Sequence, residues 1–267
     1  MVALEMPRSN PIIEVRHLHK QFGAQVVFED LNLDVYEGEV LGIVGQSGGG
    51  KSVLLRCLNG LERYSAGRIS FFGQDTAEMS GKDLRHVEAR SGLLFQDGAL
   101  FSALTVLQNI QVPMREHISL PKNIMDELAY LKLALVGLPA NAAHKYPSEL
   151  SGGMRKRAGL ARALALDPKI VFLDEPTAGL DPIGANEFDM LIRDLQRTLG
   201  LTVFMVTHDL DSIFAICDRV AVLADRKIVR HGAPAELTKD PGHPWIKSYF
   251  CGERGRKAQS TAKDTAT

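Results

Sequence analysis

Short, continuous apolar runs alternate along the chain with segments in which apolar residues recur at helical spacing. The runs at 39–44, 169–175 and 202–209 have the length and composition of buried parallel strands. Between them, residues 52–62 and 188–199 repeat apolar residues every three or four positions, which is typical of one buried helix face. This alternation predicts an α/β core with a mostly parallel sheet.

Two segments depart from that alternation. Residues 12–40 contain two β-rich stretches that end in turn residues, and residues 100–165 show helical periodicity with few β-branched runs. We therefore expect one domain over 11–250, with a helical subdomain at about 100–165. The remaining segment, 251–267, is polar and poor in large apolar residues, so we expect it to be disordered.

The segment between the first apolar run and the helical pattern after it is rich in glycine. It matches G-x-x-x-x-G-K-[ST] through Gly45, Gln46, Ser47, Gly48, Gly49, Gly50, Lys51 and Ser52. Its backbone N–H groups and the following helix start favour a bound phosphate. In this pattern Lys51 bridges the β- and γ-phosphates and Ser52 ligates magnesium. A flexible surface turn is the alternative, but the strand before it and the helix after it favour nucleotide binding.

A second candidate site lies at the end of the run 169–175, which closes with Asp174 and Glu175. The carboxyl end of a parallel strand is where open α/β sheets present ligands. We expect Asp174 to hold magnesium through water and Glu175 to polarise an attacking water. A strand that simply ends in solvated acids is the alternative.

A second anion-binding site is predicted at the helix start in "LSGGMRKRAGLARAL", residues 150–164. Ser151 is a good helix N-cap, and Gly152 and Gly153 expose backbone N–H groups at the helix start. One nucleotide does not need two phosphate cradles unless a second copy of the chain supplies one of them. An ordinary capped helix is the alternative.

Composition narrows the possible partners. The 267 residues carry a net charge of −1, which favours neither nucleic acid nor an acidic membrane surface. The three cysteines are scattered without metal-ligand spacing, as expected of reduced intracellular thiols. No run of about eighteen apolar residues occurs, so we predict no membrane span. Any membrane role then requires a partner.

Taken together, "GQSGGGKS", "LLFQDGALF", "LSGGMRKR", "IVFLDEP", "AGLD" and "VTHD" resemble, in order, the motifs of ATP-binding cassette (ABC) ATPases. The resemblance extends to about Phe250. It implies a P-loop NTPase fold with a RecA-like parallel core, an N-terminal antiparallel β-subdomain and a helical subdomain. It also implies ATP and Mg²⁺ as ligands, and a head-to-tail homodimer that sandwiches two ATP molecules.

The same resemblance assigns roles to further residues. Phe22 in "KQFG" would stack on adenine, and Gln96 would sense magnesium and the attacking water. Asp181 would lie in the loop that couples the two sites. His208 would contact the γ-phosphate and orient the attacking water. Met154 departs from the family, in which most relatives have glutamine at this position. Because a thioether cannot replace the hydrogen bonds of an amide, we expect lost polar contacts there rather than lost activity.

Residues 93–117 and 147–168 are similar to the ATPase subunits of Mla and Mce-type lipid transport systems. That branch implies transport of phospholipid or other hydrophobic cargo through transmembrane permease subunits, with a lipid-binding Mce-type protein as a further partner and no nucleic acid. The subunit would be peripheral, on the cytoplasmic side of the inner membrane. Residues 97–105 are the candidate permease contact because Leu100 and Phe101 are apolar in an apparent loop, although local core packing would also explain them.

Three other functions remain as alternatives. A soluble cassette for DNA repair or translation usually joins two cassettes or carries a long coiled-coil insertion, and neither pattern is visible. A small-molecule kinase would not need the segment 151–153. The third alternative, within the transporter class, is an importer ATPase for a polar solute such as an amino acid.

Overall fold

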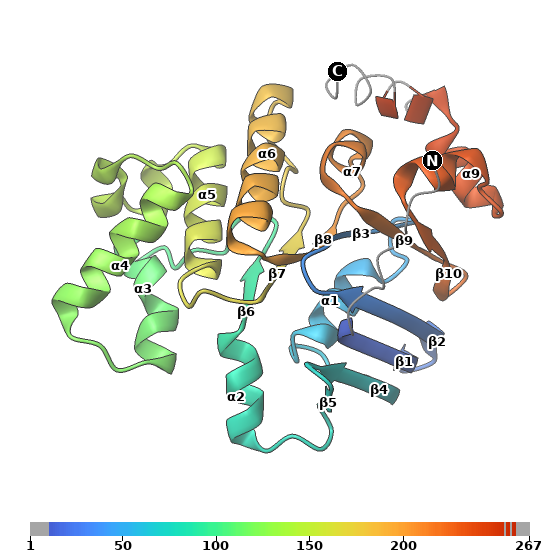
Figure 1. The fold of residues 1–267 in the computed structure, drawn as a ribbon, viewed down its shortest axis with the longest axis horizontal. Coiled ribbons are helices and arrows are strands. Elements are labelled where there is room, and N and C mark those ends of the chain that lie inside the picture. Colours follow the sequence, from blue (N-terminus) through green and yellow to red (C-terminus); the bar gives the residue numbers. More distant parts are fainter. Residues whose placement is uncertain (1–10, 254, 257, 260–267) are drawn as a thin grey trace, which may run out of the picture.

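The computed structural model describes residues 11–253, 255–256 and 258–259. Its first sheet is antiparallel, has the strand order β2-β1-β4-β5 and lies at the lower right of Figure 1. Its strands are β1 (Pro11–Phe22), β2 (Gln25–Tyr36), β4 (Ala66–Phe71) and β5 (Gln74–Asp75). The two β-rich stretches near the amino terminus therefore pair with each other, as β1 and β2.

The second sheet has six strands in the order β10-β9-β3-β8-β7-β6. Only β10 runs antiparallel to its neighbour, so the prediction of a mostly parallel core is confirmed. Because parallel strands end at one edge of a sheet, the loops after β3, β8, β7 and β6 follow one another along that edge. The strands are β3 (Val40–Gly45), β6 (Ser91–Leu94), β7 (Ile170–Asp174), β8 (Thr202–Val206), β9 (Arg219–Ala224) and β10 (Lys227–Gly232).

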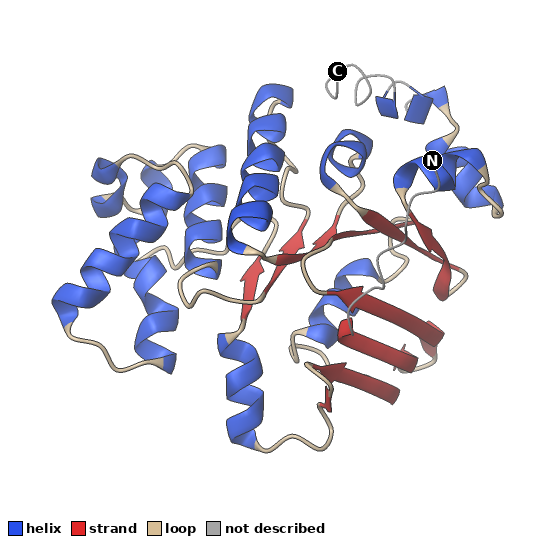
Figure 2. Cartoon of the chain, viewed as in Figure 1, coloured by secondary structure: helices blue, strands red, loops and turns tan. Residues whose placement is uncertain are grey.

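Three helices, α3 (Val106–His117), α4 (Lys122–Leu135) and α5 (Gly152–Ala163), pack on one another at the left of Figure 1. Figure 2 shows only helices and loops in this layer, which lies within the range predicted for a helical subdomain. The other helices are α1 (Lys51–Leu58), α2 (Gly81–Ala89), α6 (Pro182–Leu199), α7 (Leu210–Ile216), α8 (Pro234–Lys239) and α9 (Pro244–Phe250), with short 3₁₀ turns at Ala140–His144 and Pro147–Glu149.

The central sheet is buried on both faces. Phe172 and Leu173, neighbours on β7, point to opposite sides because side chains alternate along a strand. Phe172 packs with Phe204 and Phe71 towards the antiparallel sheet, whereas Leu173 packs in the cluster that reaches the helical layer. Burying one such side chain contributes about 1.5–3 kcal/mol. The double burial explains why these strands read as unbroken apolar runs.

The helix predicted over 52–62 ends earlier, at Leu58. Gly60 adopts a left-handed conformation with a φ of 67°, and its N–H donates to the carbonyl of Cys57, which closes the helix. Leu61 therefore lies beyond the helix and is 56% exposed, so its assignment to the buried face was wrong. Much of the tail predicted to be disordered, 251–267, lies outside the described residues.

No helix among the described residues combines the length and the hydropathy needed to cross a bilayer.

Candidate functional site

The glycine loop connects the carboxyl end of β3 to the first residue of α1. Gly50, the N-cap of α1, has a φ of 96°. A Cβ atom at this position would clash with the side chains of Val27 and Phe28, so only glycine fits. No side chain caps the helix start. The first N–H groups of α1 are thus left for a ligand, and the helix dipole favours an anion there.

Lys51 folds back over this loop. Its Nζ donates to the backbone oxygens of Gly45 and Gln46 at 2.9 and 3.1 Å. Burial lowers the pKa of Lys51, while the nearby carboxylates of Glu175 and Asp174 act in the opposite direction. The ammonium is therefore held at the mouth of the loop, where a phosphate could replace the two carbonyl acceptors.

Ser52 and Asp174 form the candidate metal pair. The Ser52 hydroxyl donates to Oδ1 of Asp174 at 3.3 Å, and burial raises the pKa of Asp174 against the opposing effect of this hydrogen bond. Hydroxyl and carboxylate oxygens suit Mg²⁺, which commonly keeps several water or phosphate ligands. The described residues contain no cluster of three or more His, Cys, Asp or Glu side chains that could hold a metal. The hydroxyl and carboxylate oxygens of the Ser52–Asp174 pair fit an Mg²⁺ ion that takes its other ligands from water or phosphate.

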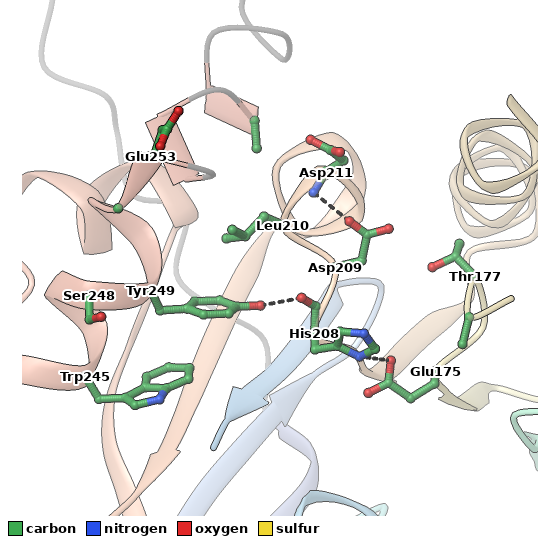
Figure 3. A pocket seen from close by; sticks show the side chains of 13 residues that line it. Glu175, Thr177, His208, Asp209, Leu210, Asp211, Trp245, Ser248, Tyr249 and Glu253 are labelled. Atoms are coloured by element: carbon green, nitrogen blue, oxygen red, sulfur yellow. Dashed lines mark hydrogen bonds and ion pairs between the residues drawn. The ribbon is translucent and has the colours of Figure 1, made fainter. Parts of the chain in front are cut away.

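Glu175 and His208 meet just beyond the carboxyl ends of the paired strands β7 and β8. Oε2 of Glu175 lies 2.7 Å from Nδ1 of His208. Figure 3 marks this contact with a dashed line. Glu175 itself has a φ of 48°, uncommon outside glycine, and its N–H donates to the carbonyl of Val206. This backbone conformation costs about 1–3 kcal/mol and therefore requires support from its surroundings.

Lys156 supplies part of that support. It lies on α5, is 5% exposed, and donates to the carbonyl of Glu175 at 3.2 Å and to that of Gln96 at 2.7 Å. The Gln96 side chain itself is exposed. Sequence analysis missed Lys156. The only signal was a lysine on the apolar side of a helix, which is weak without knowledge of the two loops it contacts.

Phe22 stands at the end of β1 and is 46% exposed. The Nζ of Lys20 lies 4.1 Å from the centre of its ring. That ammonium is buried and also bonded to Glu62 Oε1 at 2.7 Å and to the carbonyl of Arg63 at 2.6 Å. One face of the aromatic ring is thus occupied by a fixed cation, and the exposed surface of the ring suits stacking.

The segment 151–153 opens α5. The Ser151 hydroxyl accepts from the N–H of Met154 at 3.2 Å, so its prediction as an N-cap is confirmed. Met154 is half-buried and packs against the apolar core between the central sheet and the helical layer. Its thioether therefore contributes apolar packing, whereas the glutamine amide of most relatives is polar. Asp181 caps α6 and accepts from two backbone N–H groups at 3.0 and 3.1 Å.

The structure therefore brings part of the predicted set together. The glycine loop, Asp174, Glu175, His208 and the backbone of Gln96 lie along the carboxyl edge of the central sheet. Among the described residues, no interaction joins Gly152 or Gly153 to the glycine loop. Within one chain, the predicted second cradle is thus separate from the first.

A pocket of about 820 Å³ lies beside Glu175 and His208. Trp245 and Tyr249 of α9 form part of its wall, with their rings stacked at 4.6 Å. The Tyr249 hydroxyl donates to the carbonyl of His208 at 2.8 Å (Figure 3). Sequence analysis missed Tyr249 as well, because nothing in its neighbourhood indicates a contact 41 residues away.

Residues 28–178 match the family model described as ABC transporter. The chain belongs to the ABC transporter family. The chain is similar to the intermembrane phospholipid transport system ATP-binding protein MlaF of Haemophilus influenzae. The two are 42% identical over an alignment that covers 85% of each chain. The chain is 40% identical, over 96% of its length and 73% of the relative's, to the probable ribonucleotide transport ATP-binding protein mkl of Mycobacterium leprae.

Among solved structures, the ABC chain is similar to the ATP-binding cassette MJ0796, in a dimeric, post-hydrolysis state bound to ADP and Pi. The TM-score is 0.76 with 28% identity, over 83% of this chain and 98% of the other. The P-loop ABC fold and ATPase activity follow from these relationships, as predicted. The family binds ATP, and its cassettes dimerise. The alternative of a small-molecule kinase is excluded.

Proposed function

We propose that this chain is the ATP-hydrolysing subunit of a transporter that moves phospholipid or other hydrophobic cargo through a partner permease. The observation that carries the hydrolytic part is the Glu175–His208 contact of 2.7 Å. It lies beside the pair formed by Ser52 of α1 and Asp174, the last residue of β7. The similarity to MlaF over most of both chains supports the cargo class.

In this proposal the loop N–H groups and Lys51 bind the phosphates of ATP, and Phe22 stacks on its adenine. Ser52 and Asp174 hold Mg²⁺, which supplies positive charge at the phosphates when bound. Glu175 accepts the proton of the attacking water through its carboxylate, and His208 orients both that carboxylate and the γ-phosphate. The backbone strain at Glu175 fixes the direction of the base before substrate arrives.

The second phosphate cradle completes the site in a head-to-tail homodimer. Ser151, Gly152 and Gly153 of one copy would close over the ATP held by the other copy, with Asp181 and Gln96 linking the two sites. ATP binds fully only in the closed pair, and hydrolysis removes that difference in affinity, so the pair reopens. This cycle of closing and opening is the motion that a permease can use.

We propose residues 97–105 as the permease contact. Phe101 is 53% exposed, while the buried side chain of Asn109 holds its backbone N–H and carbonyl at 2.8 and 3.1 Å. Leu100 packs partly against the core, so local packing accounts for that residue. An exposed aromatic on a fixed backbone suits a docking role. The subunit would then lie peripherally on the cytoplasmic side of the inner membrane, with a lipid-binding Mce-type protein as a further partner.

Two experiments test the catalytic part. Glu175→Gln should bind ATP with Mg²⁺ but hydrolyse it at least 100-fold more slowly, and wild-type turnover would remove Glu175 from its role.

Mixing Ser151→Arg subunits with Lys51→Ala subunits should restore activity absent from either alone, because one composite site in the mixed pair is intact.

The cargo is tested by purifying the subunit with its native permease and identifying bound small molecules by mass spectrometry. Phospholipid in the complex, and its transfer on ATP addition, would support the proposal. An importer for a polar solute is the second candidate, and the similarity to mkl, a probable ribonucleotide transport protein, favours a polar cargo. Stimulation of ATPase activity by a ribonucleotide or amino acid, without bound lipid, would replace the first proposal with the second.

A further inference from the structure

A buried carboxyl group lies behind the Glu175–His208 pair and is not used in the proposed chemistry. Asp189 of α6 is 3% exposed, and its Oδ2 lies 2.6 Å from the Ser212 hydroxyl of α7. Its Oδ1 is buried without a hydrogen-bond partner. An ionised carboxylate with an unpaired buried oxygen is costly, whereas the neutral acid leaves only a carbonyl unpaired.

The hydrogen bonds of the Ser212 hydroxyl also favour a neutral Asp189. Its hydroxyl has one hydrogen but two carboxyl acceptors, Oδ2 of Asp189 at 2.6 Å and Oδ2 of Asp209 at 3.3 Å. If Asp189 is ionised, it takes that hydrogen and Asp209 loses the donor. If Asp189 is neutral, it donates its own proton to Ser212 Oγ, and the serine hydrogen turns to Asp209. Only the neutral form satisfies both contacts.

Within residues 11–253, 255–256 and 258–259, no ion pair to the Asp189 carboxyl occurs. Asp209 and Asp211, at the start of α7, face it with the same charge, and Arg193 on its own helix is bonded to both carboxylate oxygens of Asp218 at 2.8 and 3.0 Å. Cys217, beyond α7, is half-buried, and desolvation raises the pKa of its thiol. Burial, followed by the charges of Asp209 and Asp211, raises the pKa of Asp189 to about 7 against the opposing bond from Ser212.

Asp209 connects this cluster to the site. It follows His208 in sequence, caps α7 through the N–H of Asp211 at 3.0 Å, and donates its own N–H to the Thr207 hydroxyl at 3.0 Å. Thr177, two residues after Glu175, lies 3.4 Å from the Ser212 hydroxyl. The loops that carry the proposed base and the histidine thus both contact the pair formed by Asp189 and Ser212.

We propose that Asp189 is a positioning residue held in its neutral form, which through Ser212 fixes Asp209 and so the loop that carries His208. Ionisation of Asp189 breaks the Ser212–Asp209 bond and loosens that loop, and ATP hydrolysis then declines as the pH rises. This inference rests on the proposed function for its catalytic readout, but the protonation state can be measured without it.

The test compares full-length wild type, Asp189→Asn and Asp189→Leu. Asparagine keeps a donor and cannot ionise, whereas leucine has the same branching at Cγ but neither donates nor accepts a hydrogen bond. The ratio of wild-type to Asp189→Asn kcat should fall about tenfold between pH 6 and pH 8, as expected for one proton lost near pH 7. At pH 6 the asparagine variant should lie within about twofold of wild type, with KM for ATP unchanged. The leucine variant cannot compete for the Ser212 hydrogen, so the ratio of its kcat to that of the asparagine variant should stay constant from pH 6 to pH 8. Circular dichroism melts check that all three fold.

A second readout is carbon-13 NMR of aspartate carboxyl groups, with Asp189 assigned by its absence in the asparagine variant. A protonated carboxyl at pH 6 supports the inference, and an ionised one overturns it. A constant activity ratio from pH 6 to pH 8 also overturns it. If Glu175→Gln hydrolyses ATP at the wild-type rate, the proposed function fails, while the NMR measurement still decides the state of Asp189.

Discussion

Replacing Lys156 with methionine should weaken both the fold and catalysis, because its buried ammonium holds two loops at once. Methionine matches the length of the lysine stem but donates no hydrogen bond. The change removes charged hydrogen bonds of 2.7 and 3.2 Å to the carbonyls of Gln96 and Glu175. A charged bond contributes about 1.5–3 kcal/mol. The 3.2 Å bond to Glu175 is the weaker of the two and contributes near the lower limit of this range. Burial lowers the pKa of Lys156, which shows that burying its ammonium is unfavourable. Removing the ammonium therefore offsets part of the loss. The net cost is about 3 kcal/mol.

The catalytic effect follows from the backbone of Glu175. Its φ of 48° is a strained conformation, and the carbonyl of the same residue is one of the two that Lys156 holds. Without this bond the Glu175 peptide can relax and redirect the carboxylate away from the attacking water. We expect kcat to fall at least tenfold while the Kd for ATP stays within about twofold, because Lys51 and the glycine loop are untouched.

The assay combines urea unfolding with steady-state ATPase kinetics and nucleotide binding. Lys82→Met, an exposed lysine on α2, is the matched control and should leave all three measurements unchanged. Lys156→Arg keeps a donor and should recover part of the stability. If Lys156→Met matches wild type in both unfolding free energy and kcat, the assigned role of this lysine is refuted.

Two further predictions concern base binding and stability. Phe22→Ala should raise KM for ATP about tenfold with kcat nearly constant, since base stacking contributes about 1–3 kcal/mol; unchanged affinity in a calorimetric titration would mean that the ring does not contact adenine. Asp189 has a folded-state pKa of about 7 against an ordinary value of 3.8, so the native state binds the extra proton between these values. The free energy of unfolding should therefore fall from pH 4 to pH 7, relative to Asp189→Asn, by up to about 4 kcal/mol, and then level off. Parallel pH-dependent unfolding curves for the two proteins would contradict the assignment.

Much of the fold and of the site can be predicted because the relevant signals are local. The glycine loop, the acid pair after β7 and the histidine after β8 each follow an apolar run, and the parallel order of those runs places them on one edge. The alternation of apolar runs and helical periods likewise predicts the sheet and the helical layer, although the end of α1 depends on the conformation of Gly60.

Residues that act through contacts between distant elements could not be predicted in this way. Lys156 and Tyr249 each matter because of a backbone carbonyl that the fold places beside them. Asp189 and Ser212 lie 23 residues apart on different helices, and a polar residue in a helical pattern normally indicates a solvated face. Their roles require the packing of α6 on α7, which sequence periodicity does not specify.

The proposed cycle of closing and opening depends most on ATP being held between two copies of the chain. Sedimentation analysis of full-length Glu175→Gln, with and without ATP and Mg²⁺, tests this most directly. We predict a monomer without nucleotide and a dimer with ATP, and Ser151→Arg in the same background should prevent the dimer while leaving ATP bound to Lys51. A protein that binds one ATP per chain and remains monomeric at every concentration would contradict the shared site.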